Sequence, residues 1–347
     1  MIQSSVFYGV TKDLFDFWHG SEAVMTQSEL TETTSSGQLS RRQMLATTAA
    51  ALMASRSAFA APAQASPDYC TLGFSTYGMP ELKTEEAIDQ LAEIGFDAVE
   101  LTVRAGWDAD SETLKSERAQ ALRKRLNDSG MRLSSLMEHV FPTDDEQQAN
   151  ALKRLKLAAE AAHQLCPDDP PLIQTVLGGG EFTAMRNALR DRLGEWVRIA
   201  DETNTMIAIK PHRGGVVSQP AEAVWLFEQL GKPARLRMVY DYSHYAFREL
   251  PLTQTIQTAL PYVAHVAVKD AVDEGKRVVF KLPGEAGTID FATIIRELYA
   301  GGYRGDINCE VSGMVSSQPD YDSLVAARLC YRNLAEAFQK SGVRRPA

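Results

Sequence analysis

The stretch TMIAIKPHRGG, from Thr205 to Gly215, shows the pattern that decides the fold. A short apolar run that favours β structure leads directly into Lys210, a proline, His212, Arg213 and a glycine pair. Such a run is typical of a buried strand that stops abruptly at polar residues. Lys210 is either the solvated end of this strand or a group that points into a reaction site.

The same pattern, an apolar run followed by an amphipathic segment, repeats along the chain. In order, the runs are TLGFS (71–75), AVELTV (98–103), MRLSSLM (131–137), LIQTVLG (172–178), TMIAIK (205–210), RMVYD (237–241), VAHVAV (263–268) and DINCEV (306–311). Eight strand–helix units in about 270 residues predict an α/β protein built as a single (β/α)8 TIM barrel. The alternative is an open doubly wound sheet, but residues 75–84 lack the glycine-rich phosphate turn expected after its first strand.

The first 65 residues predict a different kind of segment. Arg41 and Arg42 directly precede an uncharged run at 44–54, and small residues suited to a signal peptidase follow it. This pattern predicts a cleavable twin-arginine export signal, cut after Ala60 or Ala65. The apolar run is too short for a stable membrane span. An ordinary amphipathic helix is the alternative, and Met25 is a candidate start site.

These boundaries divide the chain into an N-terminal extension with its signal at 1–65 and a barrel at 68–341. An exported protein would use the twin-arginine export machinery and work in the periplasm or otherwise outside the cytoplasm. The net charge of −9 argues against a nucleic-acid surface. An oligomer is compatible with this composition.

The carboxyl ends of the barrel strands are where a reaction site is expected. Nearly every apolar run stops at an ionisable or aromatic residue there. These residues are Tyr77, Glu100, Glu138, His139, Lys210, His212, Asp241, His244, Lys269, Asp270 and Glu310. Helices cover the outside of such a barrel, so polar residues that interrupt the runs are expected to point inward. Within 263–270, alternation places His265, Ala267 and Lys269 on one face.

Five segments in this order resemble the xylose isomerase-like TIM barrel family of sugar isomerases and epimerases. They are EIGFDAVELT (93–102), YDYSHY (240–245), HVAVKD (265–270), PGEAGTIDFATIIREL (283–298) and GYRGDINCEV (302–311). The resemblance runs from Thr71 to about Gln339. It implies a barrel enzyme that moves a proton on a sugar or cyclic polyol, beside a carbonyl group.

The resemblance also implies a site for one divalent metal, Mn, Mg or Zn, held by four inward groups on strands five to eight. Asp241 and Glu310 stand at two of these positions, but Lys210 and Ala267 stand at the other two. His244 keeps the family's Asp-x-x-His spacing. With two ligands replaced, no cofactor is firmly predicted, and Asp241 and Glu310 would be ligands only if a metal is present.

We therefore predict a catalytic group of Lys210, Asp241, His244 and Glu310. If the two carboxylates converge they repel one another, and an ammonium group between them removes that cost. The hypothesis places Lys210 where the metal would lie, as an electrophile that stabilises an oxyanion, while Glu310 or His244 moves the proton. Two alternatives are a neutral Lys210 that acts as a base or forms a Schiff base, and a purely structural ion pair.

A second predicted group binds the substrate: Glu100, His139, His212, Lys269, Tyr77 and Trp107. Tyr77 and Trp107 would form an apolar wall against a sugar ring. The long loop at 269–287 is expected to contact a polyhydroxy or anionic substrate or to form a surface lid.

The predicted function is that of an exported isomerase or epimerase acting on a small carbohydrate. The alternatives are a sugar lyase or dehydratase of the same fold, and a carbohydrate-binding barrel that has lost its metal site. The DNA-repair branch of this barrel, which the resemblance associates with a three-metal cluster, conflicts with an acidic chain that has only six histidines.

Overall fold

The computed structural model describes residues 68–275 and 277–346. The predicted twin-arginine signal lies outside these residues and stays a prediction. Within them, no helix is long and apolar enough to cross a bilayer.

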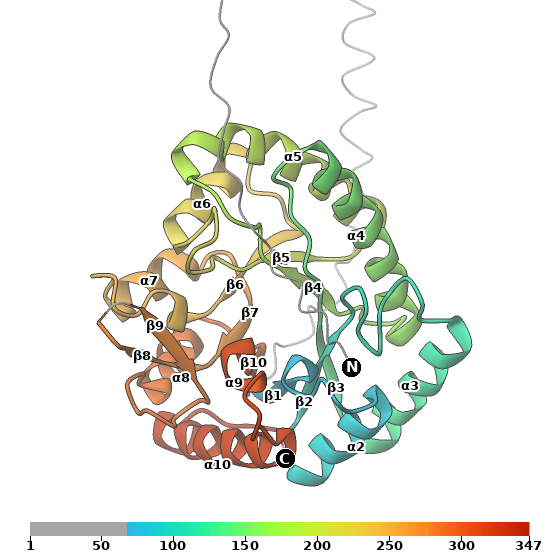
Figure 1. Cartoon of the computed structure of the whole chain (residues 1–347), viewed down its shortest axis with the longest axis vertical. Coiled ribbons are helices and arrows are strands. Elements are labelled where there is room, and N and C mark those ends of the chain that lie inside the picture. Colours follow the sequence, from blue (N-terminus) through green and yellow to red (C-terminus); the bar gives the residue numbers. More distant parts are fainter. Residues whose placement is uncertain (1–67, 276, 347) are drawn as a thin grey trace, which may run out of the picture. The chain divides into compact units, whose positions relative to one another are not determined.

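The described part of the chain forms one closed parallel barrel in the order β1-β10-β7-β6-β5-β4-β3-β2 (Figure 1). Its strands are β1 (Thr71–Ser75), β2 (Ala98–Thr102), β3 (Arg132–Met137), β4 (Leu172–Thr175), β5 (Ile207–Ile209), β6 (Leu236–Tyr240), β7 (Val263–Val268) and β10 (Asp306–Cys309). Each overlaps one of the eight runs expected to be strands. The predicted (β/α)8 TIM barrel is therefore confirmed.

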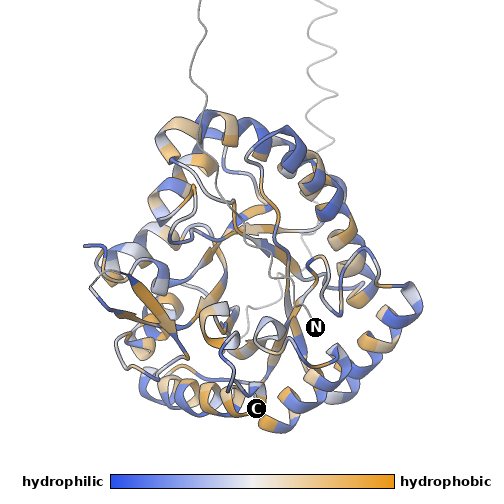
Figure 2. Ribbon diagram, in the orientation of Figure 1, coloured by the Kyte–Doolittle hydropathy of each residue, from blue (hydrophilic) through white to orange (hydrophobic). Residues whose placement is uncertain are grey.

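A helix follows each barrel strand and covers the outside. The helices are α2 (Thr84–Ile94), α3 (Ser116–Ser129), α4 (Asp145–Leu165), α5 (Phe182–Glu202), α6 (Pro220–Gln229), α7 (Leu252–Ala259), α8 (Phe291–Ala300) and α10 (Ser323–Ser341). Hydrophobic residues lie along the strands and hydrophilic ones concentrate on the outer helices (Figure 2). This division explains why the strands read as apolar runs while the helices read as amphipathic.

Short elements lie at the carboxyl ends of three strands: η1 (Thr76–Gly78), η2 (Tyr242–His244) and α9 (Gly313–Ser316). The loop expected at 269–287 instead contains an antiparallel hairpin, β8 (Asp270–Asp273) and β9 (Val278–Lys281). The Asp270 carboxylate holds the base of this hairpin by accepting hydrogen bonds from the backbone of Ala286 and Gly287, at 3.2 and 2.8 Å. The hairpin is thus anchored directly after β7.

A local turn precedes α3, which begins at Ser116. The Asp110 carboxylate accepts a hydrogen bond from the backbone N–H of Glu112 at 3.0 Å, and its carbonyl oxygen accepts one from Leu114 at 2.8 Å. This local turn competes with the first helical turn.

The inside of the barrel has a small apolar layer and a polar layer. Ala208, Val239 and Ala267 pack together there, fully or almost fully buried. One layer nearer the amino ends of the strands, His265 Nε2 lies 3.1 Å from Asn308 Nδ2 and 3.3 Å from the Ser135 hydroxyl. His265 is therefore an interior histidine, as its place in the β7 alternation predicts.

Gly73 on β1 makes room for this polar layer. A Cβ added there would overlap the Asn308 side-chain oxygen. Asn308 is itself fixed, because its Nδ2 donates to the Ser134 hydroxyl at 2.7 Å. We expect Gly73→Ala to lower the free energy of unfolding by about 1–3 kcal/mol through overpacking.

Urea denaturation measures this effect, with Gly194→Ala on α5 as the matched control. A Cβ at Gly194 meets only Leu230, at 3.7 Å, so the control should raise helix stability by up to about 1 kcal/mol. Equal stability of Gly73→Ala and the native protein would contradict the packing described for β1.

Candidate active site

Four charged side chains meet where β5, β6, β7 and β10 end. Lys210, Asp241, Lys269 and Glu310 each stand one residue after the last residue of their strand. All four are at least 93% buried. The closed parallel barrel brings these four strand ends to one face, so residues far apart in the sequence converge.

The four side chains form a continuous ion-pair network. Lys269 Nζ pairs with Asp241 Oδ2 and lies 2.9 Å from Glu310 Oε1. Lys210 Nζ pairs with Glu310 Oε2. An ammonium group does stand between the two carboxylates, but it belongs to Lys269. The sequence-based hypothesis assigned this position to Lys210, which reaches only Glu310.

The network fixes the charges of its members. Burial alone would raise the pKa of Asp241, but Lys269, His244 and Lys210 hold it well below its usual value. Burial also opposes ionisation of Glu310, yet Lys210 and Lys269 lower its pKa. Burial would lower the pKa of Lys269, and the two carboxylates raise it instead. Two positive charges thus face two negative charges in a site shielded from water.

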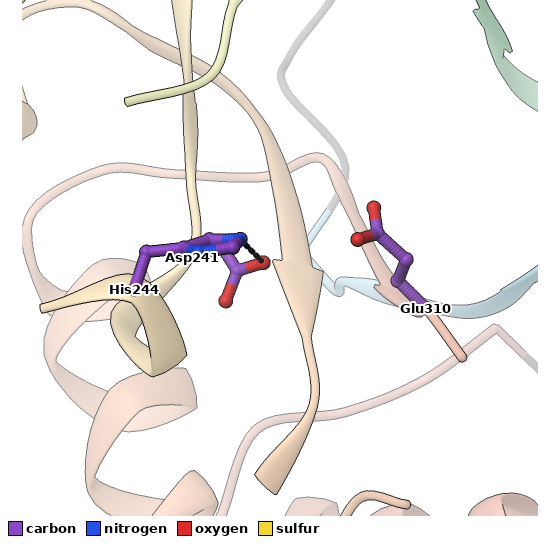
Figure 3. Close-up of side chains that lie close together, drawn as sticks. All are labelled: Asp241, His244 and Glu310. Atoms are coloured by element: carbon purple, nitrogen blue, oxygen red, sulfur yellow. Dashed lines mark ion pairs between the residues drawn. The ribbon is translucent and has the colours of Figure 1, made fainter. Parts of the chain in front are cut away.

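His244 and His212 lie against one another beside this network, with their ring planes tilted by 43°. The ring of His244 is fully buried, and its Nε2 lies 3.4 Å from Asp241 Oδ2 (Figure 3). Its Nδ1 accepts a hydrogen bond from the backbone N–H of Arg213 at 3.2 Å, so the proton of the neutral ring is on Nε2, facing Asp241. Burial and the Lys269 charge lower the pKa of His244 to about 3.

His212 is the more accessible member of the pair. Its ring centre lies 4.1 Å from that of His244. Burial and the charges of Lys269 and Lys210 lower the pKa of His212 to about 4. Both imidazoles are therefore neutral at pH 7, and His212 can accept a proton there.

Asp241, His244 and Glu310 are also the described residues that come nearest to a metal site. Each offers one ligand atom, and these atoms lie within 4.8 Å of one another. His244 Nε2 makes no well-aligned hydrogen bond to the described residues. Three donors from the protein are few for a divalent cation. The same carboxylates already accept from two ammonium groups, which would repel it. This donor set does not suit a divalent metal while both lysines hold these positions.

A cavity of about 380 Å³ opens beside the network. Lys210, His212 and Glu310 line it, whereas Asp241, Lys269 and His244 lie behind them. The glycine pairs 178–179 and 214–215 form part of its wall, so backbone borders the cavity there. The network thus has one side that faces the cavity and one side buried in the barrel.

The residues predicted to bind substrate divide between the cavity and its surroundings. Tyr77, His139 and His212 line the cavity. Trp107 stands behind Tyr77, with ring centres 5.3 Å apart. Glu100 is held in the barrel interior, where its carboxylate accepts from Ser135 and Gln174 at 2.5 and 3.0 Å. Glu100, Trp107 and Lys269 are absent from the lining, so their predicted contact with substrate has no support from the geometry.

Two residues at the site, Arg104 and Phe280, are not among those predicted from the sequence. Arg104 lines the cavity although it lies beyond the end of β2. Phe280 on β9 covers the network, with its ring centre 5.2 Å from Lys269 Nζ and 5.0 Å from the His244 ring. The apolar run VVF in the loop after β7 was the available signal for Phe280, because it predicts a strand there.

The fold agrees with what the comparisons with known proteins find. The family described as "Xylose isomerase-like TIM barrel" matches residues 88–333. The chain belongs to this family. An inosose dehydratase from Geobacillus kaustophilus (strain HTA426) is 21% identical over 285 residues, which cover 73% of this chain and 85% of that protein. A candidate hydroxypyruvate isomerase from Mus musculus is 32% identical over 91 residues, so the chain matches only 30% of its length.

Solved structures show the same fold at low sequence identity. A 3-keto-D-glucoside 4-epimerase from E. coli has a TM-score of 0.62 at 17% identity, covering 78% of this chain and 99% of that one. A D-psicose 3-epimerase from Clostridium cellulolyticum H10, solved with D-tagatose, has a TM-score of 0.63 at 17% identity and the same coverage. At this identity the likeness establishes the fold alone.

The bridging position of Lys269 makes a prediction for stability. We expect Lys269→Met to lower the free energy of unfolding by about 3–5 kcal/mol, because it leaves two buried carboxylates without their shared cation. Lys210→Met should cost less, since Glu310 keeps Lys269. Urea denaturation measures both. The control is Lys153→Met, whose exposed pair with Glu112 should contribute at most about 1 kcal/mol. A larger loss for Lys210→Met than for Lys269→Met would contradict the arrangement.

The low histidine pKa values make a prediction for pH dependence. In the unfolded chain a histidine binds its proton near pH 6.5, whereas folded His244 does so only near pH 3. The unfolded state therefore binds more protons between these values, and stability should fall as pH decreases through this window. His244 alone contributes on the order of 4 kcal/mol of this fall. Below about pH 4, protonation of Asp241 and Glu310 adds to it.

Chemical denaturation at a series of pH values tests the assignment. The pKa values of His212 and His139 are also lowered to about 4, so three histidines contribute to the slope between pH 6.5 and 4. The His244→Gln variant should lose about a third of this slope while keeping the fall below pH 4. An unchanged slope in this variant would show that the buried imidazole is not the group responsible.

Proposed function

We propose that this protein catalyses isomerisation or epimerisation of a sugar or cyclic polyol by moving a proton next to a carbonyl group, with lysines in place of a metal. The observation that carries this proposal is the position of Lys210. Lys210 lines the cavity, its ammonium group pairs with Glu310, and the neutral imidazole of His212 belongs to a residue of the same wall.

The charge of the network supports the metal-free reading. Lys210 and Lys269 together supply two positive charges, the same total as one divalent cation. They neutralise Asp241 and Glu310, the two residues that stand at family metal positions. The site can thus stabilise a developing negative charge on substrate oxygen without a metal ion.

The reaction follows from the residues that face the cavity. Lys210 donates a hydrogen bond to the carbonyl oxygen of the substrate. His212 takes the proton from the neighbouring carbon, and the electron pair of that C–H bond forms the enolate, whose oxygen Lys210 stabilises. Isomerisation is completed when the proton returns to the former carbonyl carbon and the proton of the hydroxyl on the neighbouring carbon moves to the former carbonyl oxygen, so that this neighbouring carbon becomes the new carbonyl. Return of a proton to the opposite face of the original carbon gives the epimer instead.

The buried half of the network positions these groups. Lys269 holds Asp241 and Glu310, and Glu310 in turn holds Lys210. His244 supports the ring of His212 from behind. Phe280 covers Lys269 and excludes water from one side of the ion pairs, which strengthens them.

A dehydratase is the second candidate, because an enolate next to a hydroxyl-bearing carbon can also expel that hydroxyl, which leaves as water when it takes up the proton that His212 removed. The similarity to an inosose dehydratase over 73% of this chain favours it. Export is a further part of the proposal and rests on the twin-arginine pattern at Arg41 and Arg42. The amino-terminal sequence of protein secreted by its natural host tests it, with a start after Ala60 or Ala65 expected.

Solvent deuterium exchange tests the reaction directly. Purified protein is incubated in D₂O with ketoses, 3-keto sugars and inososes, and NMR follows loss of the C–H signal next to the carbonyl. We expect exchange that falls about 10²- to 10⁴-fold in His212→Gln and about 10²- to 10³-fold in Lys210→Met. Lys153→Met is the control and should keep native exchange. Binding of these sugars without exchange would instead identify a carbohydrate-binding barrel.

Metal removal tests the role of the lysines. Dialysis against a chelator should leave the exchange rate unchanged, and metal analysis should find no stoichiometric divalent ion. One ion per chain that is lost together with activity would overturn the proposal. Borohydride treatment with substrate should not label Lys210, and covalent labelling there would show a Schiff base instead.

A further inference from the structure

The charges that line the cavity do not balance. Its positive side chains are Lys210, Arg104 and Arg213, and its carboxylates are Glu138 and Glu310. Both carboxylates already have cationic partners. Glu310 is held by the two lysines, and Arg154 from α4 holds Glu138, at 2.6 and 2.9 Å. The two arginines in the lining are therefore left with no carboxylate of the described residues within ion-pair distance.

Arg104 is the better placed of these two arginines. Its guanidinium carbon lies 5.3 Å from the centre of the Tyr77 ring, and its Nη2 lies 2.5 Å from Nδ1 of His139. Tyr77 is in turn backed by Trp107. These contacts hold the guanidinium at the cavity wall and use one of its five N–H donors. The remaining donors have the planar geometry that binds a carboxylate or a phosphate.

Arg213 adds positive charge without offering the same fork of donors. Its Nη2 donates to the carbonyl oxygen of Ala246, and its buried Nε makes no hydrogen bond to the described residues. Its side chain is thus tied to the loop after β6. Arg213 makes the electrostatic potential in the cavity more positive, while Arg104 offers the free N–H donors that can bind an anion.

We infer that the substrate carries an anionic group, a carboxylate or a phosphate ester, which Arg104 binds at the cavity wall beside Tyr77. This inference rests on the proposed function and narrows it to acidic sugars. The reacting carbons would then lie near Lys210 and His212, in the same cavity of about 380 Å³. Such a volume is near the lower end of ligand pockets and suits a small molecule.

Binding measurements with a matched set of sugars test the inference. Calorimetry compares D-fructose, D-fructose 6-phosphate and D-fructuronate, with inorganic phosphate as the minimal anion. We expect at least one anionic sugar to bind about 10- to 100-fold more tightly than D-fructose, and the preference to weaken as salt rises. Preference for the phosphate ester or for the uronate tells which anion the site accepts.

The Arg104→Met variant identifies the residue responsible. In this variant the ratio of anionic to neutral affinity should fall most of the way toward one, because only the weaker long-range effect of the Arg213 charge remains. Arg104→Lys should keep an intermediate ratio, since it retains the positive charge but lacks the planar pair of N–H donors. Arg198→Met on the exposed face of α5 is the control and should keep the native ratio. Equal binding of neutral and anionic sugars by the native protein, no binding of any anionic probe, or an unchanged ratio in Arg104→Met would overturn the inference.

The same set separates this inference from the proposed reaction. Anionic sugars that bind through Arg104 but show no deuterium exchange would uphold the anion site and reject the reaction. Exchange that occurs on neutral sugars alone, with no effect of Arg104→Met, would uphold the reaction and reject the anion site.

Discussion

The site depends on one electrostatic constraint: two carboxylates and two ammonium groups share a buried volume at the end of a barrel. None of these charges is stable there alone, because burial of an unpaired ion costs several kcal/mol. Lys269 joins Asp241 to Glu310, and Glu310 joins both to Lys210. The network is therefore cooperative, and the pair that lines the cavity, Lys210 and Glu310, is joined through Lys269 to the buried Asp241.

The histidines show how this constraint extends to proton transfer. The ammonium charges that neutralise the carboxylates also disfavour protonation of His212 and His244. The site thus combines charged lysines with neutral imidazoles at the same pH. A positive group beside a substrate oxygen and an unprotonated base beside a carbon are the two requirements for enolisation.

The barrel was predictable because every strand is covered on its outer side and therefore reads as a continuous apolar run. The convergence of Asp241 and Glu310 was predictable from their place at strand ends. The identity of the bridging lysine was not. Lys210 follows β5 and Lys269 follows β7, so both stand at the same end of the barrel. Their places in the sequence do not tell which ammonium group lies between the two carboxylates, and in the structure it is that of Lys269.

Other features depend on contacts between segments far apart in the sequence. Glu100 ends in the interior because Ser135 and Gln174 bind it there, which strand alternation alone does not reveal. The pairing of Glu138 with Arg154 arises from a helix that passes behind the strand end. The position of Arg104 is fixed by contacts with Tyr77 and His139, which lie in the loops that follow two other strands.

The hairpin β8–β9 links the ion-pair network to the outer surface of the barrel. Its ring at Phe280 touches Lys269 and His244 at once, and its first residue, Asp270, directly follows Lys269. Displacing the hairpin would admit water to the ammonium group and weaken the ion pairs beneath it. The position of the hairpin and the strength of the ion pairs are thus thermodynamically linked. A molecule that binds the outer face of the hairpin and holds it in place would therefore also strengthen the ion pairs of the site.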